Sequence, residues 1–173
     1  AHTHSYIETG QIDSKFGFGL AEGVALEAIQ RALASPYLDL VGLHAHIGSQ
    51  VFRLDGYRKA IEVLVGLIGE AHERLGFQCR YLNVGGGLGI RYTREDKPSS
   101  IADYARVKVE GVREEMTARG LPMPRVLIEP GRSIVGRAGI TAYRVGTIKE
   151  IPGVRTYVSV DGGMSDNIRP ALY

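Results

Sequence analysis

The chain has 173 residues, of which 44% are hydrophobic and 23% charged, a balance typical of a folded domain with an ordinary packed core. Its formal net charge of +2 is too small to indicate binding to nucleic acid or to an anionic membrane. No apolar run reaches the roughly 18 residues of a membrane span. The single cysteine, Cys79, excludes a disulfide within this chain, and we expect a buried apolar residue in a cytoplasmic protein.

The first predicted elements are a helix and a strand. A helix is predicted over residues 21–34, because Ala25, Ile29 and Leu33 recur at helical spacing and are expected to face inward. A buried strand is predicted over 37–47, where the sequence YLDLVGLHAHI is short and apolar and is followed by a glycine.

A second helix and strand follow. The helix is predicted over 55–76, with Asp55 as its N-cap and Gly76 at its end. The strand is predicted over 80–87, where RYLNVGGG stops at three glycines. The inward stripe of the helix is predicted to contain Tyr57, Ile61, Leu64, Val65, Ile68, Ala71 and Leu75.

The third helix is predicted between Ser100 and Gly120, followed by a third strand over 124–131. Its expected inner stripe is Ala105, Val109, Val112 and Met116. Strands thus recur about every 40 residues with a helix between them, which is typical of parallel βα units in an α/β fold. Both an open doubly wound sheet and a closed barrel fit, and both place ligands at the carboxyl ends of the strands.

The pattern changes after Gly136. Two strand-like runs, 140–151 and 155–163, are joined by a short turn without a helix, which predicts antiparallel pairing. We therefore expect two domains, 1–138 and 139–173. The chain starts without an obvious first element and stops early in the second domain, so we expect a fragment of a larger protein.

Three consecutive glycines, Gly85, Gly86 and Gly87, follow the second strand. Their backbone N–H groups could bind a phosphate, although the spaced dinucleotide pattern and the P-loop lysine are absent. A tight turn that needs positive φ is the alternative. The sequence leaves both open.

The segment HAHIGSQ, residues 44–50, begins within the first predicted strand and continues past its end. His44 and His46 are expected to share a face, but no carboxylate or third histidine stands nearby, so we expect no metal. His46 could stack on an aromatic ligand, and Ser49 could donate to a phosphate. The alternative is one core histidine bonded to the backbone and one exposed histidine.

The segment EPGR follows the third strand. Glu129 and Arg132 could form an ion pair with each other, because a buried carboxylate needs a partner. Alternatively, Arg132 binds an anion, Gly131 lets the backbone approach that anion, and Glu129 meets a protonated ring nitrogen. Near the end of the chain, Arg169 and Tyr173 could hold a carboxylate or belong to a surface loop.

Five strings taken together go beyond these local patterns: IETGQIDSKFGF, GLHAHIGSQVF, LNVGGGLGI, IEPGRSIVG and VDGGMSDNIRPALY. In this order they resemble the diaminopimelate decarboxylase family, within the alanine-racemase-like, fold type III group of decarboxylases that use pyridoxal 5'-phosphate. The resemblance implies the later part of a (β/α)8 TIM barrel, the start of a C-terminal β domain, and a homodimer with shared active sites. It also implies decarboxylation of meso-diaminopimelate to lysine.

The resemblance also implies roles for individual residues. His46 would stack on the pyridine ring and Glu129 would bond its nitrogen, while substrate binding falls to Arg132, Arg169 and Tyr173. The expected phosphate contacts are Ser49, Gly85, Gly86, Gly87, Gly131 and Arg132.

Two family features have no counterpart in this sequence. The Schiff-base lysine is expected upstream, because Lys15 does not match its position. The cysteine donated across the dimer is expected downstream, so Cys79 does not replace it. The chain alone is therefore expected to be inactive. The alternatives are a sister decarboxylase acting on ornithine, arginine or a carboxylated polyamine, a non-catalytic relative, and an unrelated phosphate-binding barrel.

Overall fold

The computed structural model describes residues 16–168 and divides the chain into two compact units after Gly136. A 3-10 turn at Ala21–Gly23 opens the described part of the first unit. The elements that follow it are α1 (Val24–Ala34), β1 (Gly42–His44), α2 (Asp55–Leu75), β2 (Tyr81–Gly86), α3 (Ile101–Ala118), β3 (Arg125–Glu129) and α4 (Gly131–Val135).

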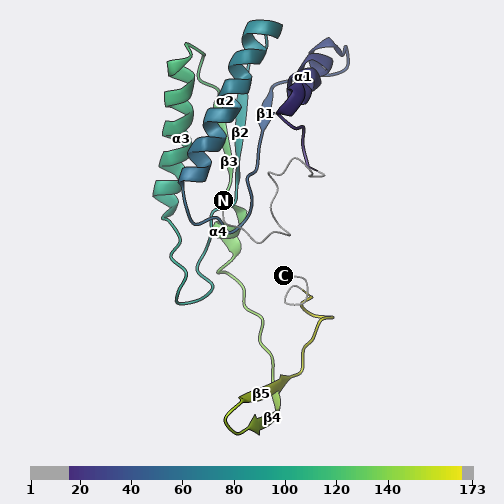
Figure 1. Cartoon of the computed structure of the whole chain (residues 1–173), viewed down its shortest axis with the longest axis vertical. Helices are drawn as coiled ribbons and strands as arrows, with labels where there is room; N and C mark the ends of the chain where they lie inside the picture. Colours follow the sequence, from purple (N-terminus) through teal and green to yellow (C-terminus); the bar gives the residue numbers. More distant parts are fainter. Residues whose placement is uncertain (1–15, 169–173) are drawn as a thin grey trace. The chain divides into compact units, whose positions relative to one another are not determined.

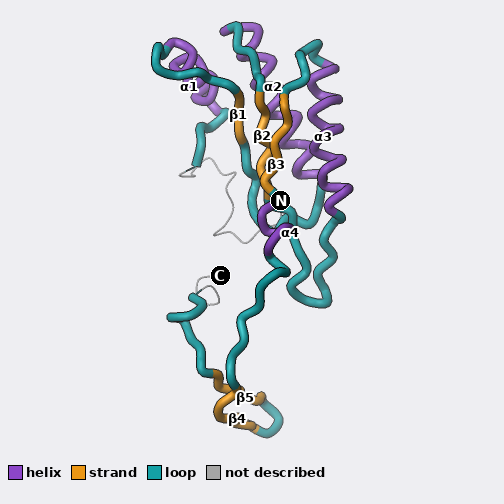
Figure 2. Tube along the Cα trace, turned by 180° about the vertical axis from the view of Figure 1, so that it is seen from behind, coloured by secondary structure: helices purple, strands orange, loops and turns teal. Residues whose placement is uncertain are grey.

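The three strands of the first unit form one parallel sheet in the order β1-β2-β3. Helices α2 and α3 pack against each other and cover the same face of this sheet (Figures 1 and 2). The predicted α/β fold is therefore confirmed. Sequential strand order with helices on one face fits a barrel wall, whereas a doubly wound sheet has helices on both faces.

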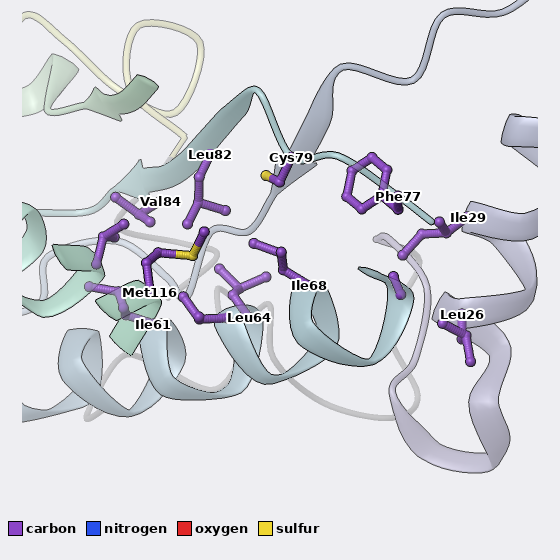
Figure 3. Close-up of a cluster of buried hydrophobic side chains, with 13 residues drawn as sticks. Leu26, Ile29, Ile61, Leu64, Ile68, Phe77, Cys79, Leu82, Val84 and Met116 are labelled. Atoms are coloured by element: carbon purple, nitrogen blue, oxygen red, sulfur yellow. The ribbon is translucent and has the colours of Figure 1, made fainter. Parts of the chain in front are cut away.

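A hydrophobic cluster lies between this sheet and its helices (Figure 3). Leu82 and Val84 of β2 contribute from the sheet, and most of the predicted α2 stripe contributes from the helix layer. Tyr57 of that stripe belongs to a second buried cluster, and Leu75 is only partly buried. Val112 and Met116 of the predicted α3 stripe are buried. The first half of the stripe is wrong, because Tyr104 and Lys108 are buried there while Ala105 and Val109 are only half-buried. The buried members of the cluster are Leu26, Ile29, Ile61, Leu64, Val65, Ile68, Ala71, Phe77, Cys79, Leu82, Val84, Val112 and Met116.

Some predicted helix details are confirmed and others are wrong. Gly76 ends α2 in the left-handed conformation, and the Ser100 hydroxyl caps α3. Asp55 does not cap α2, since it is the first helical residue and bonds Arg53 instead. Leu33 is 41% exposed because it lies in the last turn of α1, beyond the part that packs on the core.

The predicted buried strands 37–47 and 124–131 are shorter and more exposed than expected. Within the described residues, β1 and β3 each pair only with β2, so they form the two edges of the sheet. The side chains of Leu127 and Ile128 are accordingly exposed, whereas β2 is buried at its centre. Short helix α4 directly follows β3 and was not predicted.

The second unit contains β4 (Val145–Ile151) and β5 (Arg155–Val160), which pair antiparallel as predicted. Gly153 has positive φ in the turn between them. The assignment of domains 1–138 and 139–173 stays a proposal.

None of the helices in residues 16–168 has the length and apolar character needed to cross a membrane.

Candidate functional site

The carboxyl ends of the three parallel strands bring most of the predicted site residues together. His46 follows β1, Gly86 ends β2, and Glu129 ends β3. Gly86 and Glu129 are register partners, and the Gly86 N–H donates to the Nδ1 of His46 at 3.2 Å. The parallel arrangement of the strands is enough to bring these groups together at the carboxyl ends of the strands, as the sequence predicts.

The glycine loop, defined as Gly85–Gly87, packs closely between its neighbours. A Cβ on Gly85 would lie 2.5 Å from the Ala45 oxygen, and a Cβ on Gly86 or Gly87 would clash with a neighbouring backbone carbonyl. Gly85 and Gly87 also have positive φ, of 67° and 91°. The predicted turn requirement is therefore met, and close backbone approach is a second reason for glycine.

Two N–H groups of this loop already have protein acceptors. The Gly85 N–H donates to the Oδ1 of Asn83 at 2.9 Å, and the Gly86 N–H donates to His46. These bonds fix the shape of the loop. Phosphate binding through the three glycines stays a prediction, and two of its expected donors are occupied in this structure.

His46 accepts a hydrogen bond at Nδ1, so the proton of the neutral ring lies on Nε2. Burial lowers the pKa of His46 below 6.5, against the opposing charge of Glu129, while His44 and Lys108 lower it further. The lone pair of Nδ1 lies in the plane of an imidazole ring, so a hydrogen bond to it orients the ring without using either face. His46 is therefore bonded to the backbone and His44 is exposed, as the alternative prediction for this segment describes. This arrangement is compatible with stacking of His46 on an aromatic ligand.

Glu129 is held by side chains from the two other strands. Its Oε1 accepts from the Nδ2 of Asn83 at 2.7 Å, and its Oε2 lies 3.5 Å from the Nε2 of His44. The ion pair with Arg132 does not occur among the salt bridges of residues 16–168. Asn83 was missed from the sequence, although a polar residue within an apolar strand just before three glycines was a usable signal.

Arg132 lies in α4 and points to a residue that the sequence prediction missed. Its Nη1 donates to the Tyr92 hydroxyl at 2.6 Å, and its guanidinium lies 5.7 Å from the centre of that ring.

The loop that carries Tyr92 is held by Asp96. The Asp96 carboxylate accepts from the backbone N–H groups of Tyr92 and Thr93, and these bonds hold the pKa of Asp96 down. A Cβ on Gly131 would meet nothing within 4 Å, so the backbone there is open to a ligand.

The segment around Ser49 runs beside the residues that follow the glycine loop. Val51 and Leu88 form a parallel bridge, and the amide of Gln50 exchanges two hydrogen bonds with the backbone of Ile90. Gln50 has positive φ, of 58°. These contacts place half-buried Ser49 near the glycine loop, because the Gly48 oxygen is the group that a Cβ on Gly87 would strike.

Lys108 lies behind the glycine loop and is fully buried, at 0% exposure. Its Nζ donates to the carbonyl oxygens of Val84 at 2.5 Å and Gly85 at 2.9 Å. The rings of Tyr57 and Tyr104 each lie 4.5 Å from this Nζ. The sequence prediction missed Lys108, which was not among the residues expected on the inner stripe of α3.

Lys108→Met is expected to remove a pH dependence of stability. Burial lowers the pKa of Lys108 to about 7, against the opposing charge of Glu129, from 10.5 in the unfolded chain. Between these values the unfolded chain keeps a proton that the folded chain has lost, so stability rises with pH. The full window corresponds to at most about 5 kcal/mol.

Urea unfolding between about pH 7 and about pH 9.5 measures this difference on protein expressed from its complete reading frame. The upper limit lies below the pKa of about 10 that a tyrosine has in the unfolded chain. Burial raises the pKa values of Tyr57 and Tyr104 in the folded chain, so above this limit their ionisation would add a second pH dependence. Parallel stability curves for the wild type and Lys108→Met would contradict the prediction.

The remaining predicted residues are placed as follows. Arg169 and Tyr173 lie outside the described residues. Cys79 is buried in the core as expected, and burial raises the pKa of its thiol. Within residues 16–168, no three His, Cys, Asp or Glu side chains gather as a metal ion would require.

Known proteins resemble this chain over its whole length. A curated diaminopimelate decarboxylase from Bacillus subtilis is 51% identical over 173 residues, which are 100% of this chain and 39% of that protein. One from Bacillus methanolicus is 50% identical and is matched over 40% of its length. The crystal structure of diaminopimelate decarboxylase from M. jannaschii in co-complex with L-lysine matches 99% of this chain and 38% of its own, with 36% identity and a TM-score of 0.86.

The resemblance stated from the five sequence strings is thus confirmed, and the chain spans about 40% of the length of these curated relatives. The family model for the pyridoxal binding domain of pyridoxal-dependent decarboxylases matches residues 1–136. The parallel βα unit that holds His46, the glycine loop and Glu129 lies entirely within this match. This chain therefore belongs to the pyridoxal-dependent decarboxylase family.

Proposed function

We propose that the protein decarboxylates meso-diaminopimelate to L-lysine and CO2 with pyridoxal 5'-phosphate. One observation supports this most: His46, the glycine loop and Glu129 are linked by hydrogen bonds at the carboxyl ends of three adjacent parallel strands. The relatives at 50% and 51% identity are diaminopimelate decarboxylases, and the related M. jannaschii structure holds L-lysine, the expected product.

The residues present fit the cofactor. Glu129 offers a carboxylate to a ring nitrogen, and the in-plane bond to His46 holds an imidazole ring ready for stacking. The open backbone at Gly131 and the buried Tyr57 hydroxyl, which has no partner within the described residues and lies near Gly87, are suited to an anionic group. The cofactor supplies an electron sink for the carbanion left by loss of CO2.

The chain's own residues would maintain the charges that this chemistry needs. The carboxylate of Glu129 favours a protonated ring nitrogen by charge attraction, and Asn83 fixes the direction of that carboxylate. Arg132 would neutralise the phosphate together with Ser49 and loop amides, after exchange of its bond to Tyr92.

Several parts of the proposal concern groups outside the described residues. Arg169 and Tyr173 would bind a substrate carboxylate, and the lysine that bonds the cofactor and the cysteine donated across a homodimer would come from outside this sequence. A cytoplasmic location remains part of the proposal, supported by the buried free cysteine.

Lysine release from meso-diaminopimelate tests the function. Protein expressed from its complete reading frame should release lysine and CO2 in equal amounts, and only with pyridoxal phosphate bound. Ornithine, arginine and carboxynorspermidine serve as competing substrates at equal concentration. A higher kcat/KM for one of these would assign the protein to a sister decarboxylase. Cofactor binding without turnover of any of them would favour the non-catalytic relative.

A further inference from the structure

Lys108 presents an energetic problem that the proposed function does not explain. Its side chain is fully buried, yet its Nζ bonds two carbonyl oxygens and lies over two tyrosine rings, and no carboxylate forms a salt bridge with it among residues 16–168. Burying a cation without a counter-ion is costly, and an apolar side chain of similar length would avoid the cost. The position of Lys108 therefore calls for a role in the structure around it.

The first carbonyl leads from Lys108 to Glu129. Lys108 donates to the oxygen of Val84, and the N–H of the same peptide group, on Gly85, donates to the Oδ1 of Asn83. The Nδ2 of Asn83 then donates to the Oε1 of Glu129. When Lys108 is protonated, a cation and a carboxylate thus stand at opposite ends of one unbroken series of hydrogen bonds.

The second carbonyl leads from Lys108 to His46. Lys108 and the Tyr104 hydroxyl both donate to the oxygen of Gly85, at 2.9 and 3.3 Å. The N–H of that peptide group, on Gly86, donates to the Nδ1 of His46. A donor at the carbonyl end of a peptide polarises its N–H, so this series strengthens the bond to the imidazole.

We propose that Lys108 is a positioning residue for the cofactor site, acting through two peptide groups to orient the Nδ1 acceptor of His46 and the carboxylate of Glu129. The inference deepens the proposed function and rests on it for the identity of the cofactor. Lys108 touches neither substrate nor cofactor in this role. Its two bonds hold the Val84 and Gly85 carbonyls on the helix side of the loop, and the N–H groups consequently point to Asn83 and His46.

Two substitutions whose side chains are equal in length to each other distinguish the hydrogen bonds of Lys108 from the volume that its side chain fills. Lys108→Met keeps an apolar stem but has no donor, whereas Lys108→Gln has an uncharged amide with two N–H donors and a carbonyl acceptor. Lys59→Met is the control, because Lys59 is exposed on α2 and pairs with Glu62 on its own helix. All are made in protein expressed from its complete reading frame.

The first readout is the tautomer of His46, from ring-nitrogen NMR of histidine-labelled protein without cofactor, assigned with His46→Asn. The wild type and Lys59→Met should carry the proton on Nε2, and Lys108→Met should show a mixture of tautomers.

The second readout is the dissociation constant for pyridoxal phosphate, which should rise about tenfold in Lys108→Met and less in Lys108→Gln. Wild-type values of both in Lys108→Met would overturn the proposal.

A variant that loses thermal stability but keeps the His46 tautomer and the cofactor affinity would also overturn it, because a merely structural lysine behaves this way. If the wild type does not bind pyridoxal phosphate, the proposed function fails. The tautomer measurement still decides the role of Lys108, since it needs no cofactor.

If Lys108→Met does not fold, the unaltered protein supplies the test. The Cε resonance of Lys108 and the amide resonances of Gly85 and Gly86 are followed between about pH 6 and about pH 9. The glycine amides should shift with the midpoint of Lys108, and their independence from it would overturn the proposal. The other titratable groups facing Lys108 are Tyr57 on α2, Tyr104 on α3, His46 after β1 and Glu129 on β3.

Discussion

Glu129→Gln is expected to cut the turnover number for meso-diaminopimelate by about 100-fold. The substitution keeps the shape of the side chain and an oxygen that accepts from Asn83, so the geometry at the end of β3 is retained. It removes the negative charge, and an adjacent opposite charge shifts a pKa by about 1 to 3 units. A smaller fraction of bound cofactor would then have a protonated ring nitrogen, and the electron sink would be weaker.

The dissociation constant for pyridoxal phosphate should change much less, by under about tenfold, because the contacts to its phosphate are unchanged. The cofactor's absorbance spectrum measures the protonation change independently of turnover. Glu114→Gln is a matched control, since Glu114 pairs with Arg58 on the helix surface. Equal turnover in Glu129→Gln and the wild type would remove Glu129 from this role.

The apolar pattern was sufficient to predict α1, α2, α3 and the parallel sheet, because burial at helical spacing and short apolar runs are local signals. It also placed His46, the glycine loop and Glu129 at one edge, since parallel strands bring their carboxyl ends together. It overestimated the burial of β1 and β3. A single sequence does not show which strands are edges, and each of these pairs only with β2 within the described residues.

The contacts of the site could not be predicted in the same way. The hydrogen bonds from Asn83 to Glu129, from Lys108 to Val84 and from Arg132 to Tyr92 join residues that are 46, 24 and 40 positions apart in the chain. Lys108 was left out of the predicted inner stripe of α3, and lysine is a residue that is rarely buried. The spacing of four residues from Tyr104, and again to Val112, would have placed it on the inner face of α3.

Gly86→Ala is expected to lower the free energy of unfolding by about 3 kcal/mol and to abolish tight cofactor binding. Its new Cβ would overlap the backbone oxygen of Glu129, which cannot rotate away as a flexible side chain could. Relief requires that β2 and β3 separate at their carboxyl ends, which would break the bond from Gly86 to His46. Urea unfolding and a pyridoxal phosphate titration measure the two effects.

Gly66→Ala is the control, because its Cβ on α2 would meet nothing within 4 Å and alanine favours a helix by up to about 1 kcal/mol. Wild-type stability and affinity in Gly86→Ala would contradict the close approach of the two strands.

The clash involves Glu129, whose charge is proposed to support turnover, so Gly86→Ala and Glu129→Gln should not act independently. If Gly86 acts on turnover through Glu129, the double variant with Glu129→Gln at saturating cofactor should be little slower than Gly86→Ala alone. Multiplied losses would instead mean that Gly86 acts mainly through His46.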